Sequence, residues 1–252
     1  MTSATTTEAV QGYLDLDGVR TYYEAIGAGS PLVLLHGGMC PVETWAGLVP
    51  QLSGSFRVFT PERRGHGRTA DPGPITYENM ATDTIAFLEA IADGPVALVG
   101  WSDGAVVALL VALWRPDLVE RLVYVGNAIN REGVPAEVEA MAEHLSPDVL
   151  PPMLRQLHDA VSPDGPDHFD LVFEKLAHLW KTEPNLELSE LASLSMPTLL
   201  VAADHDMVTV EQLAAAQRTI PDAQLAIVPG SDHGFPMEHP DLLAGLLHRF
   251  LT

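Results

Sequence analysis

The chain has 252 residues, of which 47% are hydrophobic and 19% are charged, so it is long enough to bury one large core. Acidic residues outnumber basic ones by 34 to 13, which gives a formal net charge of −21. A surface of this charge repels phosphate backbones and anionic lipids, which argues against nucleic acid or a membrane as a partner.

The first residues and the cysteine content indicate a protein of a reducing compartment. Cys40 is the only cysteine, so no internal disulfide can form. Residues 1–10 are rich in Thr and Ala and lack the basic and apolar regions of a signal peptide, so we expect a disordered tail there. No apolar run is long enough to span a membrane. These features predict a cytoplasmic protein.

The N-terminal part predicts a hairpin followed by strands that alternate with helices. The Asp17-Gly18 pair separates two strand-like runs and favours a two-residue turn. A continuous apolar run at 31–35 predicts a buried strand, and residues 56–60 predict another. The spacing of apolar residues over 42–52 predicts a helix between those two strands.

The stretch 95–115 carries the strongest signal in the chain. Val96–Val99 is a short apolar run typical of a buried parallel strand, and the apolar residues after Gly104 predict a buried helix. Between them lies Gly100-Trp101-Ser102-Asp103-Gly104, a G-x-S-x-G turn. Glycines on both sides let a strand reverse directly into a helix and hold the serine above the sheet. Ser102 is therefore the candidate nucleophile.

The remaining elements predict a mainly parallel sheet that is interrupted by a long helical insertion. An amphipathic helix at 77–91 precedes the G-x-S-x-G turn, and a strand at 119–125 follows it. Helices and turns alone are then expected at about 135–145, 148–161, 166–181 and 187–194. Alternation resumes with strands at 197–204 and 224–228 and helices at 209–220 and 240–251. An insertion of this length is too long for an ordinary connection.

The serine needs a base and an acid that orients the base, in the chain order Ser, Asp or Glu, His. His233 follows the last predicted strand in a run of small, turn-forming residues and is the candidate base. The acid should follow the preceding strand, where both Asp204 and Asp206 lie. Asp206 is favoured because it lies further into the loop, and Asp204 is the alternative.

Stabilising the negative charge of a transition state requires two backbone N–H donors. One is expected from Asp103, the residue after the nucleophile. The other is expected from the glycine-containing loop after the strand at 31–35, with Gly38 preferred and Met39 as the alternative. His36, in the same loop, is interpreted as a structural hydrogen-bonding residue rather than a second base.

Taken together, these motifs resemble the α/β-hydrolase superfamily: His36-Gly37-Gly38, Arg64-Gly65-His66-Gly67-Arg68, the turn around Ser102, Asp206 and His233. The resemblance implies an α/β fold with a mostly parallel eight-stranded sheet flanked by helices. It further implies a core of residues 11–127 and 197–252, with a helical cap at 128–196.

The turn Gly-Trp-Ser-Asp-Gly is similar to that of the valacyclovir hydrolase branch, in which the acid after the serine is associated with recognition of a substrate amino group. Asp103 could therefore face the acyl pocket and bind an α-ammonium group. The other interpretation is that its charge merely favours the positive end of the helix dipole.

The sequence thus predicts a serine hydrolase that cleaves a small carboxylic ester through an acyl-enzyme, with no cofactor and no metal. Lactone, amide or C–C bond hydrolysis and cofactor-free perhydrolysis are alternatives for the same residues, and a non-catalytic small-molecule receptor is a further one. Possible substrate-binding residues are Met39, Trp101 and Phe235. The expected partner is a small-molecule substrate, and the expected state is a monomer or a homodimer.

Overall fold

The computed structural model, which describes residues 9–142 and 144–252, is built on one eight-stranded sheet with the order β1-β2-β4-β3-β5-β6-β7-β8. β2 runs antiparallel to both β1 and β4, and the other neighbours are parallel. This arrangement confirms the predicted fold class. The strands are β1 (Val10–Leu16), β2 (Val19–Ile26), β3 (Ser30–Leu35), β4 (Phe56–Pro61), β5 (Val96–Trp101), β6 (Val119–Val125), β7 (Thr198–His205) and β8 (Ala223–Asp232).

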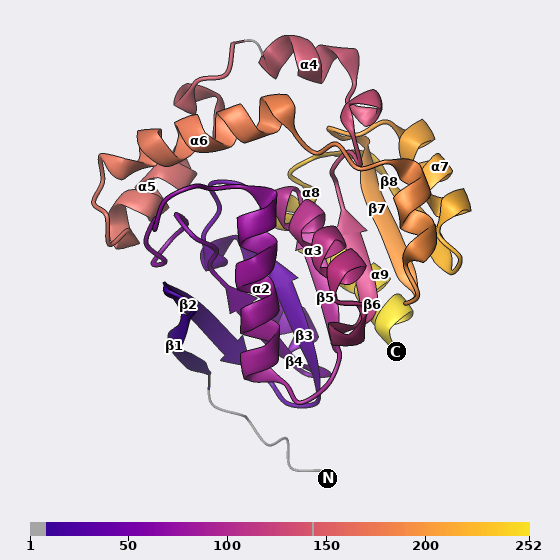
Figure 1. The fold of residues 1–252 in the computed structure, drawn as a ribbon, viewed down its shortest axis with the longest axis horizontal. Coiled ribbons are helices and arrows are strands. Elements are labelled where there is room, and N and C mark those ends of the chain that lie inside the picture. Colours follow the sequence, from indigo (N-terminus) through magenta and orange to yellow (C-terminus); the bar gives the residue numbers. More distant parts are fainter. Residues whose placement is uncertain (1–8, 143) are drawn as a thin grey trace.

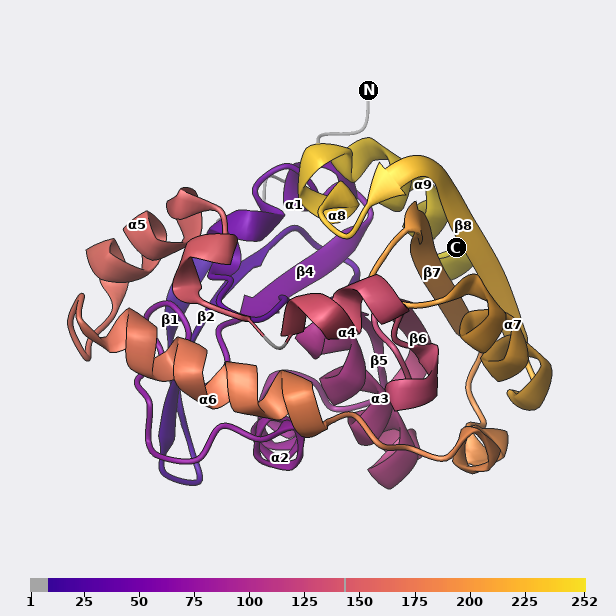
Figure 2. The ribbon, with the colours of Figure 1, turned by 90° about the horizontal axis from the view of Figure 1, so that it is seen from above.

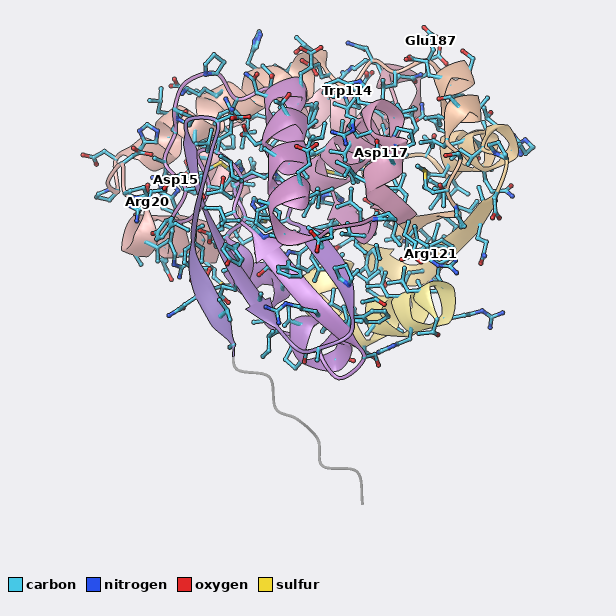
Figure 3. The ribbon with its side chains drawn as sticks, turned by 60° about the horizontal axis from the view of Figure 1, so that its bottom comes forward. Asp15, Arg20, Trp114, Asp117, Arg121 and Glu187 are labelled. Carbon is cyan, nitrogen blue, oxygen red and sulfur yellow. The ribbon has the colours of Figure 1, made fainter. Side chains whose placement is uncertain are left out.

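The predicted hairpin forms the edge of the sheet. Asp17 and Gly18 connect β1 to β2, and both have positive φ angles, 44° and 90°, as the mirror-image turns of tight hairpins require. Next to this turn, Asp15 pairs in register with Arg20, and Figure 3 labels both residues on the hairpin.

Helices cover both faces of the sheet. As Figures 1 and 2 show, α2, α3 and α7 lie on one face, and α1 and α9 lie on the other. α3 is apolar all round and is buried from Asp103 to Ala112, and it packs against β3, β5 and β6 of the sheet and against α2. The bounds of the core helices are η1 (Val42–Trp45), α1 (Val49–Leu52), α2 (Tyr77–Ile91), α3 (Asp103–Trp114), η2 (Pro116–Leu118), α7 (Val210–Thr219), α8 (Phe235–Glu238) and α9 (Pro240–Leu251).

The segment between β6 and β7, called the helical segment below (residues 126–197), lies across the end of the sheet towards which the parallel strands run (Figure 1). Its longest helix, α6, buries one row of side chains at helical spacing: Phe169, Val172, Phe173, Leu176 and Leu179. The elements of this segment are η3 (Arg131–Gly133), α4 (Ala136–Ala142), η4 (Pro147–Val149), α5 (Pro152–Val161), α6 (His168–Thr182) and η5 (Leu188–Ser193).

Three helix predictions were wrong in extent or type. The helix expected over 42–52 is divided into η1 and α1, because Gly47 lies between them and Pro50 can only occupy a first helical turn. The helix expected from 148 begins at Pro152, the second proline of the Pro151-Pro152 pair. The helix expected at 187–194 is the 3₁₀ helix η5.

At the N-terminus, residues 1–8 of the expected disordered tail lie outside the described residues, and Val10 already belongs to β1. None of the described helices combines the length and the apolar character needed to cross a membrane.

Candidate active site

The turn around Ser102 has the strained geometry that its glycines predict. Ser102 has φ 56° and ψ −124°, a combination that side-chain-bearing residues rarely adopt. A Cβ atom on Gly100 would collide with the backbone of Gly104, and one on Gly104 would collide with the carbonyl of Leu35. The Ser102 N–H donates to the carbonyl of Val125 at 2.8 Å, which fixes the turn to β6. The serine is thereby held at the N-terminus of α3.

Three predicted residues from distant parts of the chain meet at this point. His233, in the turn after β8, lies with Nε2 2.9 Å from Ser102 Oγ and Nδ1 2.6 Å from Asp206 Oδ1. Because an ionised carboxylate can only accept, Nδ1 carries the proton and Nε2 is free to accept one from the serine hydroxyl. The three groups therefore form one directed series of hydrogen bonds.

Asp206 is held as an ionised acceptor. Its carboxylate is buried, which alone would raise its pKa, but hydrogen bonds from His233 and from the backbone N–H groups of Ala203 (3.0 Å) and Met207 (2.7 Å) outweigh burial, and the pKa lies below its ordinary value. Asp204 instead accepts from the backbone N–H groups of Gly230 and Ser231, at 2.8 and 3.1 Å. Of the two acids left open by the sequence, Asp206 is the one that reaches His233.

The loop after β3 packs directly against the nucleophile. The position of a Cβ on Gly37 would lie 3.3 Å from Ser102 Cβ. The N–H groups of Gly38, Met39 and Asp103 take part in none of the hydrogen bonds found among the described residues, so each remains available as a donor. Met39 has a left-handed backbone with φ 59° and a buried side chain. The geometry keeps Gly38 and Met39 as the two candidates for the second donor.

The Asp103 side chain is not free, contrary to one expectation. Its carboxylate is only 1% exposed and accepts from Tyr77 Oη at 2.8 Å and from Trp180 Nε1 at 2.9 and 3.0 Å. Tyr77 begins α2, whereas Trp180 belongs to α6 of the helical segment. The carboxylate beside the nucleophile therefore joins the core to the helical segment.

The other predicted substrate-binding residues are buried around the same point. Trp101 donates from Nε1 to the carbonyl of His233 at 3.1 Å and packs edge-on against Trp45. Phe235, in α8, is fully buried. Trp101 thus supports the turn that carries His233.

His36 has the structural role that was predicted. It is buried, and its Nε2 accepts from the backbone N–H of Arg63 at 3.1 Å. Burial and the nearby Arg63 charge hold the pKa of His36 well below its ordinary value.

Sequence reasoning missed three residues of the site: Arg63, Tyr77 and Trp180. Trp180 lies in the helix predicted over 166–181, and helical spacing does not reveal that its indole N–H reaches Asp103. Tyr77 marked only a helix start. Arg63 and Arg64 both follow the predicted strand at 56–60, and nothing in this pair shows from the sequence which arginine is buried.

Two further features of the described residues bear on ligands. No group of three or more His, Cys, Asp or Glu side chains with the geometry of a metal site occurs in 9–142 or 144–252. A cleft of about 680 Å³ lies on the helical segment between the turn at Leu145–Asp148 and α6, and none of the residues around Ser102 lines it.

Comparisons with known proteins give one consistent result. The model of the alpha/beta hydrolase family matches residues 32–246. The chain is 26% identical over 269 aligned positions to the 2-hydroxy-6-oxo-6-(2'-aminophenyl)hexa-2,4-dienoic acid hydrolase of Metapseudomonas resinovorans, covering 96% of this chain and 91% of that one.

It is also 26% identical over 260 positions to the pimeloyl-[acyl-carrier protein] methyl ester esterase of Nitrosospira multiformis, covering 92% of this chain and 98% of the relative. Among solved structures, the meta-cleavage product hydrolase of Pseudomonas fluorescens has the same fold. Its TM-score is 0.81 at 21% identity, over 98% of this chain and 97% of that one.

Proposed function

Because the chain belongs to the alpha/beta hydrolase family, we propose that it cleaves a small carboxylic ester through an acyl-enzyme on Ser102. The observation that carries the proposal is the directed series from Ser102 through His233 to Asp206, at 2.9 and 2.6 Å. A serine hydroxyl is a weak nucleophile at neutral pH, and such a series supplies both its base and the group that orients the base.

In the first half of the reaction, Ser102 Oγ attacks the ester carbonyl carbon while its proton passes to His233 Nε2. The imidazolium that forms is stabilised by the Asp206 carboxylate, which stays ionised. The carbonyl oxygen becomes negatively charged and binds the N–H groups of Asp103 and Gly38. His233 then gives its proton to the departing alcohol, which leaves Ser102 acylated.

In the second half, water replaces the alcohol. His233 Nε2 takes a proton from the water as its oxygen attacks the acyl carbon, and the same two N–H groups bind the oxygen of the second intermediate. His233 returns the proton to Ser102 Oγ, and the acid product leaves. The ester and one water molecule are the only reactants of the two halves, and every proton that His233 takes up is given back.

The surroundings of Asp103 limit the substrate class. A carboxylate next to the nucleophile repels anionic acyl groups, which favours uncharged or cationic esters. The Trp180 ring packs against Gly38: a Cβ atom added to Gly38 would lie only 2.6 Å from Cζ2 of the indole. We therefore treat residues 128–196 as a cap on the core formed by 11–127 and 197–252, with Trp180 limiting the size of the acyl group.

Hydrolysis of a C–C bond is the second candidate, and the similarity to the dienoic acid hydrolase of Metapseudomonas resinovorans favours it. The substrate in the name of that relative is a carboxylic acid, so its negatively charged carboxylate would have to bind near Asp103. The sequence relative that is a methyl ester esterase acts on a neutral ester group instead. The charge beside Ser102 is the reason for placing ester hydrolysis first.

A turnover screen separates these functions. Purified protein is tested with p-nitrophenyl esters of increasing acyl length, with a lactone, an amide and a 2-hydroxy-6-oxo-hexa-2,4-dienoic acid, in wild-type and Ser102→Ala forms. We expect the short esters to be turned over fastest, and the Ser102→Ala variant to lose at least about 10⁴-fold with its fold intact.

Labelling with a fluorophosphonate probe supplies an independent readout. The wild type should react stoichiometrically at Ser102 and the variant should not. Faster turnover of the dienoic acid than of every ester would replace the ester assignment, and Ser102-independent turnover would overturn the acyl-enzyme.

A further inference from the structure

Arg63 is a buried cation placed directly behind the loop that carries Gly38. It follows β4 by two residues and is only 3% exposed. Its guanidinium donates to two successive backbone carbonyls of that loop, from Nη1 to His36 and from Nη2 to Gly37 at 3.2 Å. The mechanism above gives Arg63 no role.

The hydrogen bonds of His36 reinforce this arrangement. Its Nε2 accepts from the backbone N–H of Arg63, so in the neutral ring Nδ1 carries the proton. Nδ1 then donates to the Gly37 carbonyl at 2.7 Å. The Cys40 N–H reaches the same carbonyl at 3.3 Å. Three donors thus converge on one peptide oxygen.

This carbonyl belongs to the same peptide unit as the Gly38 N–H. The unit is trans, so its C=O and N–H point in opposite directions. Holding the oxygen towards Arg63 therefore directs the Gly38 N–H to the opposite side of the loop. Glycine at both positions would otherwise make rotation of this peptide easy.

The charge of Arg63 is also costly, which argues for a function. Among the described residues, its Nε has no partner and its guanidinium is hydrogen-bonded to no carboxylate, although the Asp103 charge is close enough to act on it. Burial lowers the pKa of Arg63 to about 10, so the group stays charged at neutral pH. Burying a charge without an ion-pair partner costs folding free energy, so a purely stabilising role does not account for Arg63.

We propose that Arg63 is a positioning residue for catalysis: it fixes and polarises the Gly37–Gly38 peptide so that the Gly38 N–H is presented to the oxyanion. The proposal rests on the function proposed above. A cation on the carbonyl oxygen withdraws electron density from the N–H of the same peptide and makes it a stronger donor. A stronger donor at this position stabilises the negative charge that develops on the oxyanion.

The test compares Arg63→Met, which removes the charge, with Arg63→Lys, which keeps the charge but loses the pair of N–H donors that the planar guanidinium directs at two carbonyls. The matched control is Arg64→Met, because the side-chain hydrogen bonds of Arg64 go to Asp83 and to the Pro74 carbonyl and not to the Gly37–Gly38 peptide. Rates on a short p-nitrophenyl ester are expressed per active site, counted by fluorophosphonate titration. This normalisation keeps a partly folded variant informative.

We expect Arg63→Met to lower kcat about 10²–10³-fold with KM within about threefold, the pattern of a lost oxyanion donor. Arg63→Lys should lose about 10-fold, since a lysine ammonium cannot bond both carbonyls in the fixed geometry of the arginine fork. Arg64→Met should keep its kcat per active site even where its thermal transition falls.

A second readout separates positioning from a general structural role. A trifluoromethyl ketone forms an oxyanion on Ser102, whereas the corresponding secondary alcohol does not. Inhibition by the ketone should weaken in proportion to the loss of kcat/KM, while binding of the alcohol stays unchanged. Equal weakening of both compounds, or an unchanged kcat in Arg63→Met and Arg63→Lys, overturns the proposal. If the Ser102→Ala variant hydrolyses the ester as fast as the wild type, the proposed function is wrong.

Discussion

The end of the sheet that carries Ser102 and the helical segment above it are built in opposite ways. Around Ser102, charged and polar side chains such as Asp206, Asp103 and Arg63 are buried and hydrogen-bonded by the backbone or by neighbouring side chains. The helical segment buries one row of α6 and leaves large apolar side chains in water, with Met141 61% and Met153 50% exposed. The ion pairs formed within this segment, Arg131 with Glu139 and Arg155 with Asp170, lie on the surface.

This contrast separates the chemistry from the choice of substrate. Groups held by strand ends and backbone N–H donors keep the geometry that bond cleavage requires. A segment packed on one side can change its sequence and position at a smaller cost, so under the proposed function we expect the acyl group to be selected there. Trp180 lies where the two regions meet, because it belongs to α6 and bonds Asp103.

The largest expected effect comes from breaking the series of hydrogen bonds that joins Ser102, His233 and Asp206. Asp206→Asn should lower kcat by about 10⁴-fold, because an amide favours the wrong imidazole tautomer of His233. Asp204→Asn is the matched control. It has the same chemical change two residues away, on a carboxylate that bonds only β8 backbone, and should stay within about threefold.

Steady-state rates on one ester, with circular dichroism to verify the fold, measure both variants. A large loss in Asp204→Asn together with a small one in Asp206→Asn would show that the acid had been assigned to the wrong residue.

A smaller effect is expected where the two regions meet. Trp180→Phe keeps the ring but removes the indole N–H, so Asp103 Oδ2 loses its donor while Oδ1 keeps Tyr77. An α-ammonium group could then bond this oxygen, worth about 1.5–3 kcal/mol, or one to two decades in kcat/KM. We expect the wild type to treat an α-amino-acid ester and its des-amino analogue alike within about threefold, and Trp180→Phe to prefer the amino ester by about 10-fold or more.

The double variant Trp180→Phe with Asp103→Asn is the control, and it should lose the preference while neutral esters react as before. A strong preference for the amino ester already in the wild type would show that the Asp103 carboxylate is available in the presence of Trp180.

Patterns among residues close in sequence predicted most of the sheet and of the turn that carries Ser102. A two-residue Asp17-Gly18 turn, apolar runs for buried strands, and glycines flanking Ser102 each depend on residues close in sequence, and the structure bears them out. Chain order also placed Asp206 and His233 where the structure brings them together. Prediction failed where proline and glycine interrupt an apolar pattern, as in residues 42–52.

The contacts across the junction could not be predicted, since they join residues far apart in sequence. Tyr77, Asp103 and Trp180 meet only because α2 and α6 approach the same strand end from different sides. Apolar periodicity assigns Trp180 to a buried face and is blind to the hydrogen bond of its N–H. Likewise, nothing in the run of arginines indicates that Arg63 turns inward while Arg64 pairs with Asp83.

The smallest effect on turnover is expected at a second junction between the two regions, around Asp71 in the loop before α2. The Asp71 carboxylate is buried and accepts from His168 Nε2 at 3.0 Å and from Lys175 Nζ, both in α6. Burial raises its pKa, but the bonds from Lys175 and His168 outweigh burial, and the pKa lies below its ordinary value.

Because the pKa of Asp71 is lower in the folded than in the unfolded state, its ionisation stabilises the fold. That contribution is fully present above the unfolded pKa of about 4 and is lost as the pH falls through the lower folded pKa. Asp71→Asn should therefore reduce the free energy of unfolding by about 1–2 kcal/mol at pH 7, and the difference from wild type should shrink as the pH falls towards 2.

Urea unfolding at pH 7 and near pH 2 measures this difference, and Asp170→Asn on the exposed face of α6 is a control that should change stability much less. A pH-independent difference would mean that Asp71 acts through its neutral hydrogen bonds, and the helical segment would then be joined to the core without help from charge.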